Sequence, residues 1–246
     1  EEVRRKFFGT LYNTYSFFSL YANIDGFYYK ETDIPLDKRP ELDRWILSSL
    51  YSIIAQVDEH FDNYEPTKAA RLIYSFVTED LSNWYVRLSR RRFWKGTYEE
   101  DKISAYQTLY TCLISIAKLM APIAPFYADR LYQDLDATTE KEQYASVHLA
   151  YFPTANNEFI AADLEKKMQL AQRIVSLVLS IRKKEKIKVR QPLKKVLIPA
   201  LDSQEKQAIL EVSDLIAAEV NVKTIEILDD ASSILVPVRW QSWSHL

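Results

Sequence analysis

Glycine is scarce in this chain, and that scarcity limits the folds open to it. Only 3 of the 246 residues are Gly, whereas an ordinary usage of about 7% would give roughly 17. Glycine serves where φ must be positive or where the backbone approaches a ligand closely. Because Gly9, Gly26 and Gly96 lie far apart, they cannot form a G-x-G-x-x-G turn or a P-loop. The usual dinucleotide and nucleoside-triphosphate sites are therefore excluded, and an all-β sandwich is disfavoured.

Apolar residues recur at steps of three and four along the first half of the chain, which is the period of an amphipathic α-helix. With prolines and glycines at the ends, this pattern predicts helices at residues 2–24, 42–62, 66–95, 98–121 and 125–135. Four or five such helices joined by short links are typical of an antiparallel bundle.

The pattern changes after residue 136. A polar connection there includes an extended segment at residues 146–153, and a helix is predicted at 160–184. Residues 194–200 and 222–228 are rich in β-branched side chains and are predicted strands, with a helix at 203–218 that Ser203 caps. We therefore expect a mainly α fold: a helical bundle at 1–140, a connection at 141–158, a small α/β domain at 159–234 and an atypical tail at 235–246, whose Trp240 and Trp243 carry no functional inference.

The composition also bounds the class of protein. No run of about 18 apolar residues is present, so no membrane span is expected. The chain begins without Met or an apolar signal segment, which predicts a segment of a longer protein. The single Cys112 cannot form an internal disulfide or a Cys-rich zinc site, and we expect it to be a small buried residue of a cytoplasmic protein.

No catalytic or metal-binding pattern is present in the sequence. The three histidines are far apart, at positions 60, 148 and 245, and none lies in an H-x-x-x-H or H-x-E pattern. There is no G-x-S-x-G nucleophile motif. We therefore expect no catalytic residue, no metal site and no cofactor in this chain.

Positive charge is concentrated in two short segments. Residues 86–95 have a net charge of +5 and residues 182–195 of +7, so the remainder of a chain whose total is −2 must be strongly acidic. This arrangement favours a polyanion bound at defined places. Taken alone, a run of charges is more often a solvated helix face.

The predicted helix at 66–95 is the most informative element. Its first half has a buried stripe of Ala69, Leu72, Ile73 and Phe76, and the same face continues through Asp80, Asn83, Trp84, Arg87, Arg91 and Trp94. Burying Arg87 and Arg91 unpaired would cost several kcal/mol each, and on this face Asp80 is an available acid only near its start. This half therefore projects toward something anionic, and aromatics among arginines suit single-stranded RNA, which needs stacking faces and phosphate-binding cations.

At this helix the sequence becomes similar to a known family. The segments D-R-W-I-L-S-S-L (43–50), Y-E-P-T-K-A-A-R-L-I-Y-S-F-V-T-E-D-L-S-N-W-Y-V-R-L-S-R-R-R-F-W (64–94), S-V-H-L-A-Y-F-P (146–153) and I-R-K-K-E-K-I-K-V-R-Q-P-L (181–193) resemble the anticodon-binding domain and the start of the junction domain of isoleucyl-tRNA synthetases, which are class I aminoacyl-tRNA synthetases. The resemblance covers roughly residues 1–230. It implies a helical bundle that holds the anticodon stem-loop of isoleucine tRNA.

The resemblance also implies what lies elsewhere in such an enzyme. The catalytic domain, with its sites for ATP and Mg²⁺, belongs to another part of the parent chain and is expected as a partner of this segment in a monomeric protein. Trp84 matches the position of an anticodon-stacking Trp in the related methionine enzyme, and Asn13 is carried over in the same way. The expected RNA contacts are Asn13, Trp84, Arg87, Arg90, Arg91, Arg92, Trp94, Lys95, Arg182, Lys183, Lys184, Lys188 and Arg190.

Two other interpretations stay open at this point. The segment could come from a valyl- or leucyl-tRNA synthetase, which share the D-R-W-I-L-S motif. Alternatively, it could be a helical protein-interaction module that binds no RNA and uses its basic segments to dock an acidic partner.

Overall fold

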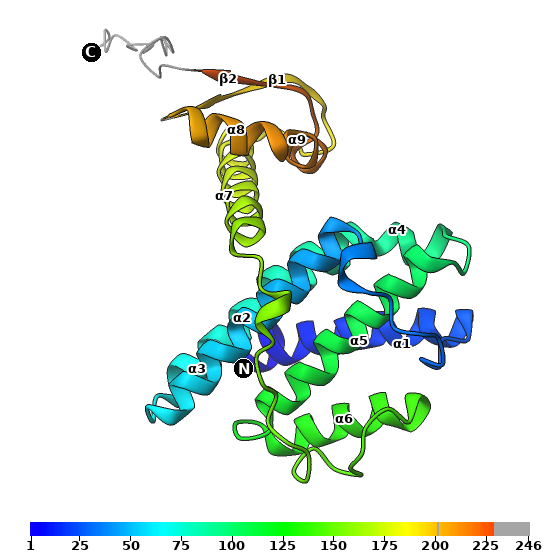
Figure 1. The fold of residues 1–246 in the computed structure, drawn as a ribbon. Coiled ribbons are helices and arrows are strands. Elements are labelled where there is room, and N and C mark those ends of the chain that lie inside the picture. The colour runs from blue at the N-terminus through cyan, green and yellow to red at the C-terminus, as the bar shows by residue number, and fades with distance from the viewer. Residues whose placement is uncertain (201, 229–246) are drawn as a thin grey trace, which may run out of the picture. The chain divides into compact units, whose positions relative to one another are not determined.

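The computed structural model describes residues 1–200 and 202–228 of the chain (Figure 1). They fall into two compact units, one from Glu1 to Ala162 and one that begins at Asp163. The predicted tail at 235–246 lies outside the described residues, as do Trp240 and Trp243. Among the described residues, no helix combines the length and the apolar character that a membrane crossing requires.

The first unit is helical throughout its regular structure, as predicted. Its elements in chain order are η1 (Arg4–Phe8), α1 (Gly9–Asp25), η2 (Leu36–Lys38), α2 (Glu41–Asp62), α3 (Pro66–Ser75), η3 (Phe76–Val86), α4 (Arg87–Lys95), α5 (Glu100–Met120), α6 (Pro125–Thr139) and η4 (Asn157–Phe159). Pro66 and Pro125 lie in the first turns of α3 and α6, where the missing N–H costs nothing. Gly26 ends α1 with φ of 70°, and its amide donates to the carbonyl of Ala22.

Helix α5 is the centre of this unit. It packs against α1, α2, α3, α4 and α6 (Figure 1), and its side chains are buried on nearly every face. A helix that is buried on all sides is apolar on most of them. The apolar residues that α5 contributes to the core include Leu109, Leu113, Ile116 and Leu119, each with 0% of its surface exposed.

The helix predicted at 66–95 is continuous, but its twist is not that of a single α-helix. Residues 76–86 form wide π-helical turns between α3 and α4. A helical wheel drawn with 3.6 residues per turn therefore does not identify the buried positions in this segment. Through the π segment and into α4 the core is lined at every fourth residue, by Val77, Leu81, Tyr85, Ser89 and Phe93. Arg87 and Arg91 therefore do not lie on the core face, as the wheel had drawn them, but beside this core stripe, and both are exposed, as expected for a half that projects from the core.

The second unit contains α7 (Ala162–Lys184), β1 (Leu193–Pro199), α8 (Ser203–Glu211), α9 (Ser213–Val220) and β2 (Val222–Leu228). The two strands pair in parallel, with Lys195 opposite Thr224. The strand–helix–strand order is as predicted, with the single predicted helix at 203–218 divided at Val212.

Two local predictions are corrected. The cap of α8 is Asp202 and not Ser203, because the Asp202 carboxylate accepts a hydrogen bond from the amide of Glu205 at 2.7 Å. Residues 146–153 contain turns and irregular backbone in place of the expected extended segment. The backbone of this segment is held to α6 by Asp129, whose carboxylate accepts from the amide of Val147 at 3.0 Å.

Candidate nucleic-acid interface

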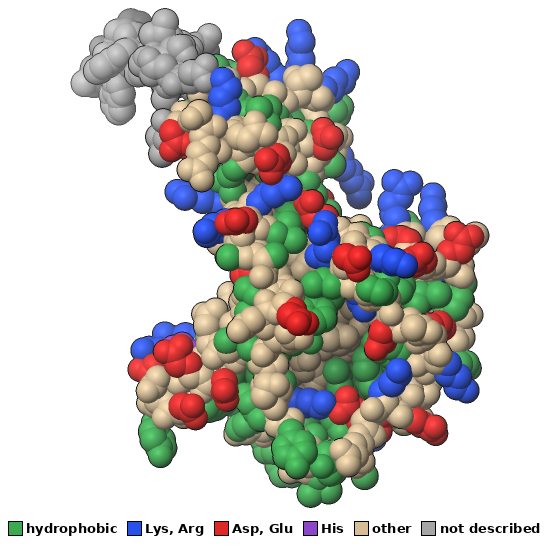
Figure 2. All heavy atoms as spheres, in the orientation of Figure 1, with side chains coloured by type: hydrophobic (Ala, Val, Ile, Leu, Met, Phe, Trp, Pro, Cys, Tyr) green, Lys and Arg blue, Asp and Glu red, His purple; other side chains and the backbone are tan. Residues whose placement is uncertain are grey.

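One side of α4 presents a group of exposed basic and aromatic side chains. We call this group the α4 patch; its members are Arg87, Arg90, Arg91, Trp94 and Lys95. Trp94 has 59% of its surface exposed, an unusual state for so large an aromatic residue. In Figure 2, Lys and Arg side chains stand over the place that α4 occupies in Figure 1. The patch offers an exposed aromatic face among positive charges.

Three of these cations are not used within the protein. Among the described residues, Arg90, Arg91 and Lys95 have no hydrogen-bond or ion-pair partner. The Arg87 side chain folds back along the helix, and its Nε donates to the carbonyl of Asn83, one turn earlier, at 2.7 Å. Arg90, Arg91 and Lys95 can therefore take a phosphate without first breaking a bond inside the protein.

Trp84 has a different environment from Trp94. Only 7% of its surface is exposed, and the guanidinium carbon of Arg87 lies 5.9 Å from the centre of its ring. This distance is that of a cation–π contact. A base could stack on this ring only after the Arg87 side chain moved away.

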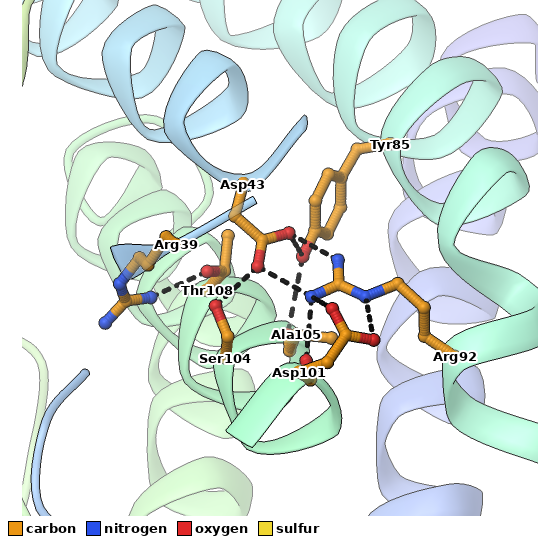
Figure 3. Close-up of polar contacts among 8 residues, drawn as sticks. All are labelled: Arg39, Asp43, Tyr85, Arg92, Asp101, Ser104, Ala105 and Thr108. Carbon is orange, nitrogen blue, oxygen red and sulfur yellow. Dashed lines mark hydrogen bonds and ion pairs between the residues drawn. The ribbon is translucent and has the colours of Figure 1, made fainter. Parts of the chain in front are cut away.

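Arg92 points away from the patch into a cluster of polar side chains (Figure 3). Its Nη1 and Nη2 donate to the two carboxylate oxygens of Asp43 at 2.6 and 2.8 Å. The hydroxyls of Tyr85 and Ser104 also donate to Asp43, at 2.9 and 2.6 Å. The side chain of Asp43 is fully buried, so its charge is neutralised by these four hydrogen bonds and not by water.

The same arginine also binds helix α5. Its Nη2 lies 3.0 Å from a carboxylate oxygen of Asp101 and donates to the Asp101 carbonyl at 2.7 Å. Burial by itself would lower the pKa of Arg92, but its hydrogen bonds to Asp43 and the neighbouring acids raise that pKa overall. Arg92 thus ties α4 to α2 and α5 as a permanently charged anchor, and the expectation that it contacts RNA is withdrawn on this geometry.

Sequence reasoning missed Asp43 as the partner of this arginine. Asp43 lies on the same helical face as Ile46, Leu47 and Leu50, all of them buried. An acid three, four and seven residues before apolar core positions is expected to be buried, and a buried acid requires a cation. This spacing could have predicted that Asp43 is buried and paired with a cation. It does not identify Arg92 as that cation.

Helix α1 lies next to the end of α4. The rings of Phe17 and Phe93 are in edge contact, with their centres 5.1 Å apart. Asn13 is one turn before Phe17 and is exposed, so it lies on the side of α1 that borders α4. The structure thus places Asn13 and the α4 patch in the same unit, on neighbouring helices.

The second basic segment is divided by the structure. Lys183, Lys184, Lys188 and Arg190 are exposed at the end of α7 and in the loop that follows. Arg182 is different, with 2% of its surface exposed and its guanidinium bonded to backbone carbonyls. Arg182 is therefore withdrawn as a direct RNA contact, and the four exposed residues stay as candidates.

The described residues contain no group of three or more His, Cys, Asp or Glu side chains placed to hold a metal ion. Cys112 is buried in α5, and burial raises the pKa of its thiol far above the ordinary value. A thiol that keeps its proton is a poor nucleophile.

Comparison with known proteins gives the family. Residues 43–198 match the family described as the anticodon-binding domain of tRNA ligase. The chain belongs to this family. Proteins named isoleucine–tRNA ligase resemble it over nearly its whole length: the one from Bacteroides fragilis (strain YCH46) is 60% identical over 236 residues, the one from Porphyromonas gingivalis 58% over 236, and the one from Thermus thermophilus 41% over 234.

These alignments cover 95 to 96% of the chain but only 20 to 22% of the relatives. The chain thus spans about a fifth of the length of the curated relatives it matches. The resemblance inferred from the tryptophan and arginine segment is confirmed, and these relatives carry the isoleucine specificity in their name.

Proposed function

We propose that this chain is the part of an isoleucine–tRNA ligase that binds the anticodon stem-loop of isoleucine tRNA. The observation that carries the proposal is the α4 patch: uncommitted cations and an exposed tryptophan, on a helix fixed in place, within an anticodon-binding domain. Aminoacylation, with its ATP and Mg²⁺, is then performed by the remaining four-fifths of the parent protein, which we expect to act as a monomer in the cytoplasm.

The chemistry of the patch suits a single-stranded loop. Arg90, Arg91 and Lys95 would neutralise phosphates and so set the orientation of the loop, while unstacked bases carry the sequence information. Trp94 offers a face on which one base can stack, a contact worth about 1 to 3 kcal/mol. Asn13 offers an amide whose donor and acceptor can pair with a base edge.

Two tryptophan variants separate stacking from packing. Trp94→Ala is expected to weaken binding of the stem-loop about 5- to 150-fold, the equivalent of 1 to 3 kcal/mol, while leaving the unfolding free energy almost unchanged. Trp84→Ala removes a buried ring and is expected to lower the unfolding free energy by about 3 to 5 kcal/mol. The opposite result, with Trp84→Ala folding normally and losing affinity, would assign stacking to Trp84.

The phosphate contacts are tested by the salt dependence of binding. Each phosphate contact to a single strand contributes about −0.7 to the slope of log affinity against log salt concentration. The double variant Arg90→Ala/Arg91→Ala should therefore reduce the slope by about 1.4. Arg130→Ala is the matched control, because this exposed arginine on α6 is already paired with Asp134 at 3.0 Å.

The rival interpretation, a module that docks an acidic protein, gives a different result. It predicts no shift of the stem-loop in a gel at any salt concentration. It also predicts equal behaviour of the Arg90→Ala/Arg91→Ala variant and the parent chain toward RNA.

A further inference from the structure

The second unit contains a buried cation that is held only by backbone carbonyls. Arg182, in the last turn of α7, donates from Nη1 to the carbonyls of Lys188 and Gln191 at 3.3 and 3.1 Å. Its Nη2 donates to the carbonyls of Gln191, Val220 and Asn221 at 3.1, 2.7 and 3.0 Å. No carboxylate is paired with it among the described residues.

These carbonyls belong to two pieces of backbone that the arginine joins. Lys188 and Gln191 lie in the segment at 185–192 between α7 and β1, which we call the basic loop. Val220 is the last residue of α9, and Asn221 links it to β2. The side chain of Asn221 adds a second clamp, because its Nδ2 donates to the carbonyl of Val189 at 2.9 Å. The conformation of the basic loop is therefore set by Arg182, with help from Asn221.

The basic loop displays its own cations outward. Lys186, Lys188 and Arg190 are exposed, and none of their side chains has a hydrogen-bond or ion-pair partner among the described residues. Arg182 faces the opposite way and lacks an acid, so its positive charge is not cancelled and adds to the field of the loop. Burying a cation is costly unless hydrogen bonds compensate it; five bonds from Nη1 and Nη2 to four carbonyls compensate that cost in part, while Nε is buried without a partner among the described residues.

We propose that Arg182 is a positioning residue for a phosphate-binding site formed by the basic loop. This inference rests on the proposed function, with tRNA backbone phosphate as the ligand. Arg182 does not touch the RNA; it holds the loop so that Lys188 and Arg190 bind phosphate at the same time. Lysine cannot replace it, because one ammonium has three donors on a single point whereas the guanidinium fork spans two backbone segments.

The test compares tRNA binding by Arg182→Lys and by Lys188→Ala/Arg190→Ala across a range of salt concentrations. Both variants are expected to reduce the slope of log affinity against log salt by about 1.4 to 1.8, the loss of two phosphate contacts. Combining them should give no further reduction, since the loop then has no contacts left to misplace. Arg173→Lys, at an exposed position on the same helix, is the control and should leave the slope unchanged.

Hydrogen exchange shows whether the unit stays folded. The amide of Gln191, which donates to the Lys188 carbonyl at 3.0 Å, should lose protection in Arg182→Lys while amides of β1 keep theirs. If β1 also loses protection, Asn221→Gly takes its place as the test: it keeps the positive φ of 50° accessible, removes the clamp on Val189 and should reduce the slope in the same direction.

Three results are decisive. An unchanged slope in a folded Arg182→Lys chain would overturn the positioning role of Arg182, and an unchanged slope in Asn221→Gly would overturn the premise that the conformation of the basic loop sets its phosphate binding. A further reduction in the combined variant would also overturn it, because Arg182 would then act on binding independently of the loop. A normal slope in Lys188→Ala/Arg190→Ala, with the α4 patch variants still impaired, would instead remove the loop from the proposed RNA contacts.

Discussion

The Asp43–Arg92 pair is expected to be the main polar anchor of α4, and Asp43→Asn tests that expectation. The substitution keeps the size of the side chain but removes its charge, and its amide group then faces donors from Arg92, Tyr85 or Ser104. Breaking a buried ion pair by removing one partner costs about 3 to 5 kcal/mol. The Arg92 side chain is 16% exposed and keeps Asp101, so we expect the lower end of this range, about 3 kcal/mol.

Urea unfolding measured by circular dichroism gives the free energy, and the first unit should also melt about 6 to 12 °C lower. The matched control is Asp101→Asn. Its carboxylate binds the same arginine but is 60% exposed, so its loss should cost less than about 1 kcal/mol. If the two variants lose the same small amount of stability, burial does not strengthen the Asp43 contact and α4 is held by apolar packing alone.

Three further predictions concern the glycines, the buried thiol and two buried tyrosines. Gly26→Ala should lower the unfolding free energy by about 1 kcal/mol because φ is 70° at this position, whereas Gly9→Ala should not, because Gly9 has a helical φ of −62° where η1 passes into α1; equal effects in urea unfolding would refute this reasoning. Cys112 should react with a thiol reagent only after unfolding, because it is fully buried; rapid reaction of the folded chain would contradict its placement. Burial raises the pKa of Tyr110 and of Tyr127 to about 12 each, so the folded chain keeps protons that the unfolded chain loses near pH 10, and stability should fall as the pH rises from 10 to 12; an unfolding free energy that stays constant between pH 8 and 11 would argue against this.

The helices could be predicted closely because their ends are marked in the sequence. Pro66 and Pro125 begin helices, and Gly26 and Gly96 follow the ends of two others. The two strands were also predictable from their β-branched residues, whereas their parallel pairing was not predicted. These signals are local, and local signals survive in the folded chain when they agree with the packing around them.

The parts that could not be predicted depend on non-local contacts. Arg92 and Asp43 are 49 residues apart, and a basic run gives no indication that one of its members turns inward. Arg182 likewise meets Val220 from 38 residues away. The π-helical turns at 76–86 have no signature in hydrophobic spacing. The wheel drawn through Ala69 and Phe76 therefore placed Arg87 on the core face, where it does not lie.

The different roles that we expect for Trp84 and Trp94 follow from their different burial, which the spacing of residues in the sequence does not predict. Both Trp84 and Trp94 lie on the stripe drawn from the sequence. The structure leaves 7% of the first exposed and 59% of the second. Of these two, Trp94 is therefore the more open to an RNA base, whereas the resemblance pointed to Trp84.

We propose that this chain distinguishes anticodon loops, and competition binding tests this proposal most directly. The chain is bound to a labelled anticodon stem-loop of isoleucine tRNA and titrated with unlabelled stem-loops of isoleucine, valine and methionine tRNA at one fixed salt concentration. The isoleucine stem-loop should displace the label at the lowest concentration. In Trp94→Ala, the displacing concentrations of the three stem-loops should lie closer together. Equal displacement by all three stem-loops would show that the chain binds phosphates without reading the anticodon, and would contradict the claim.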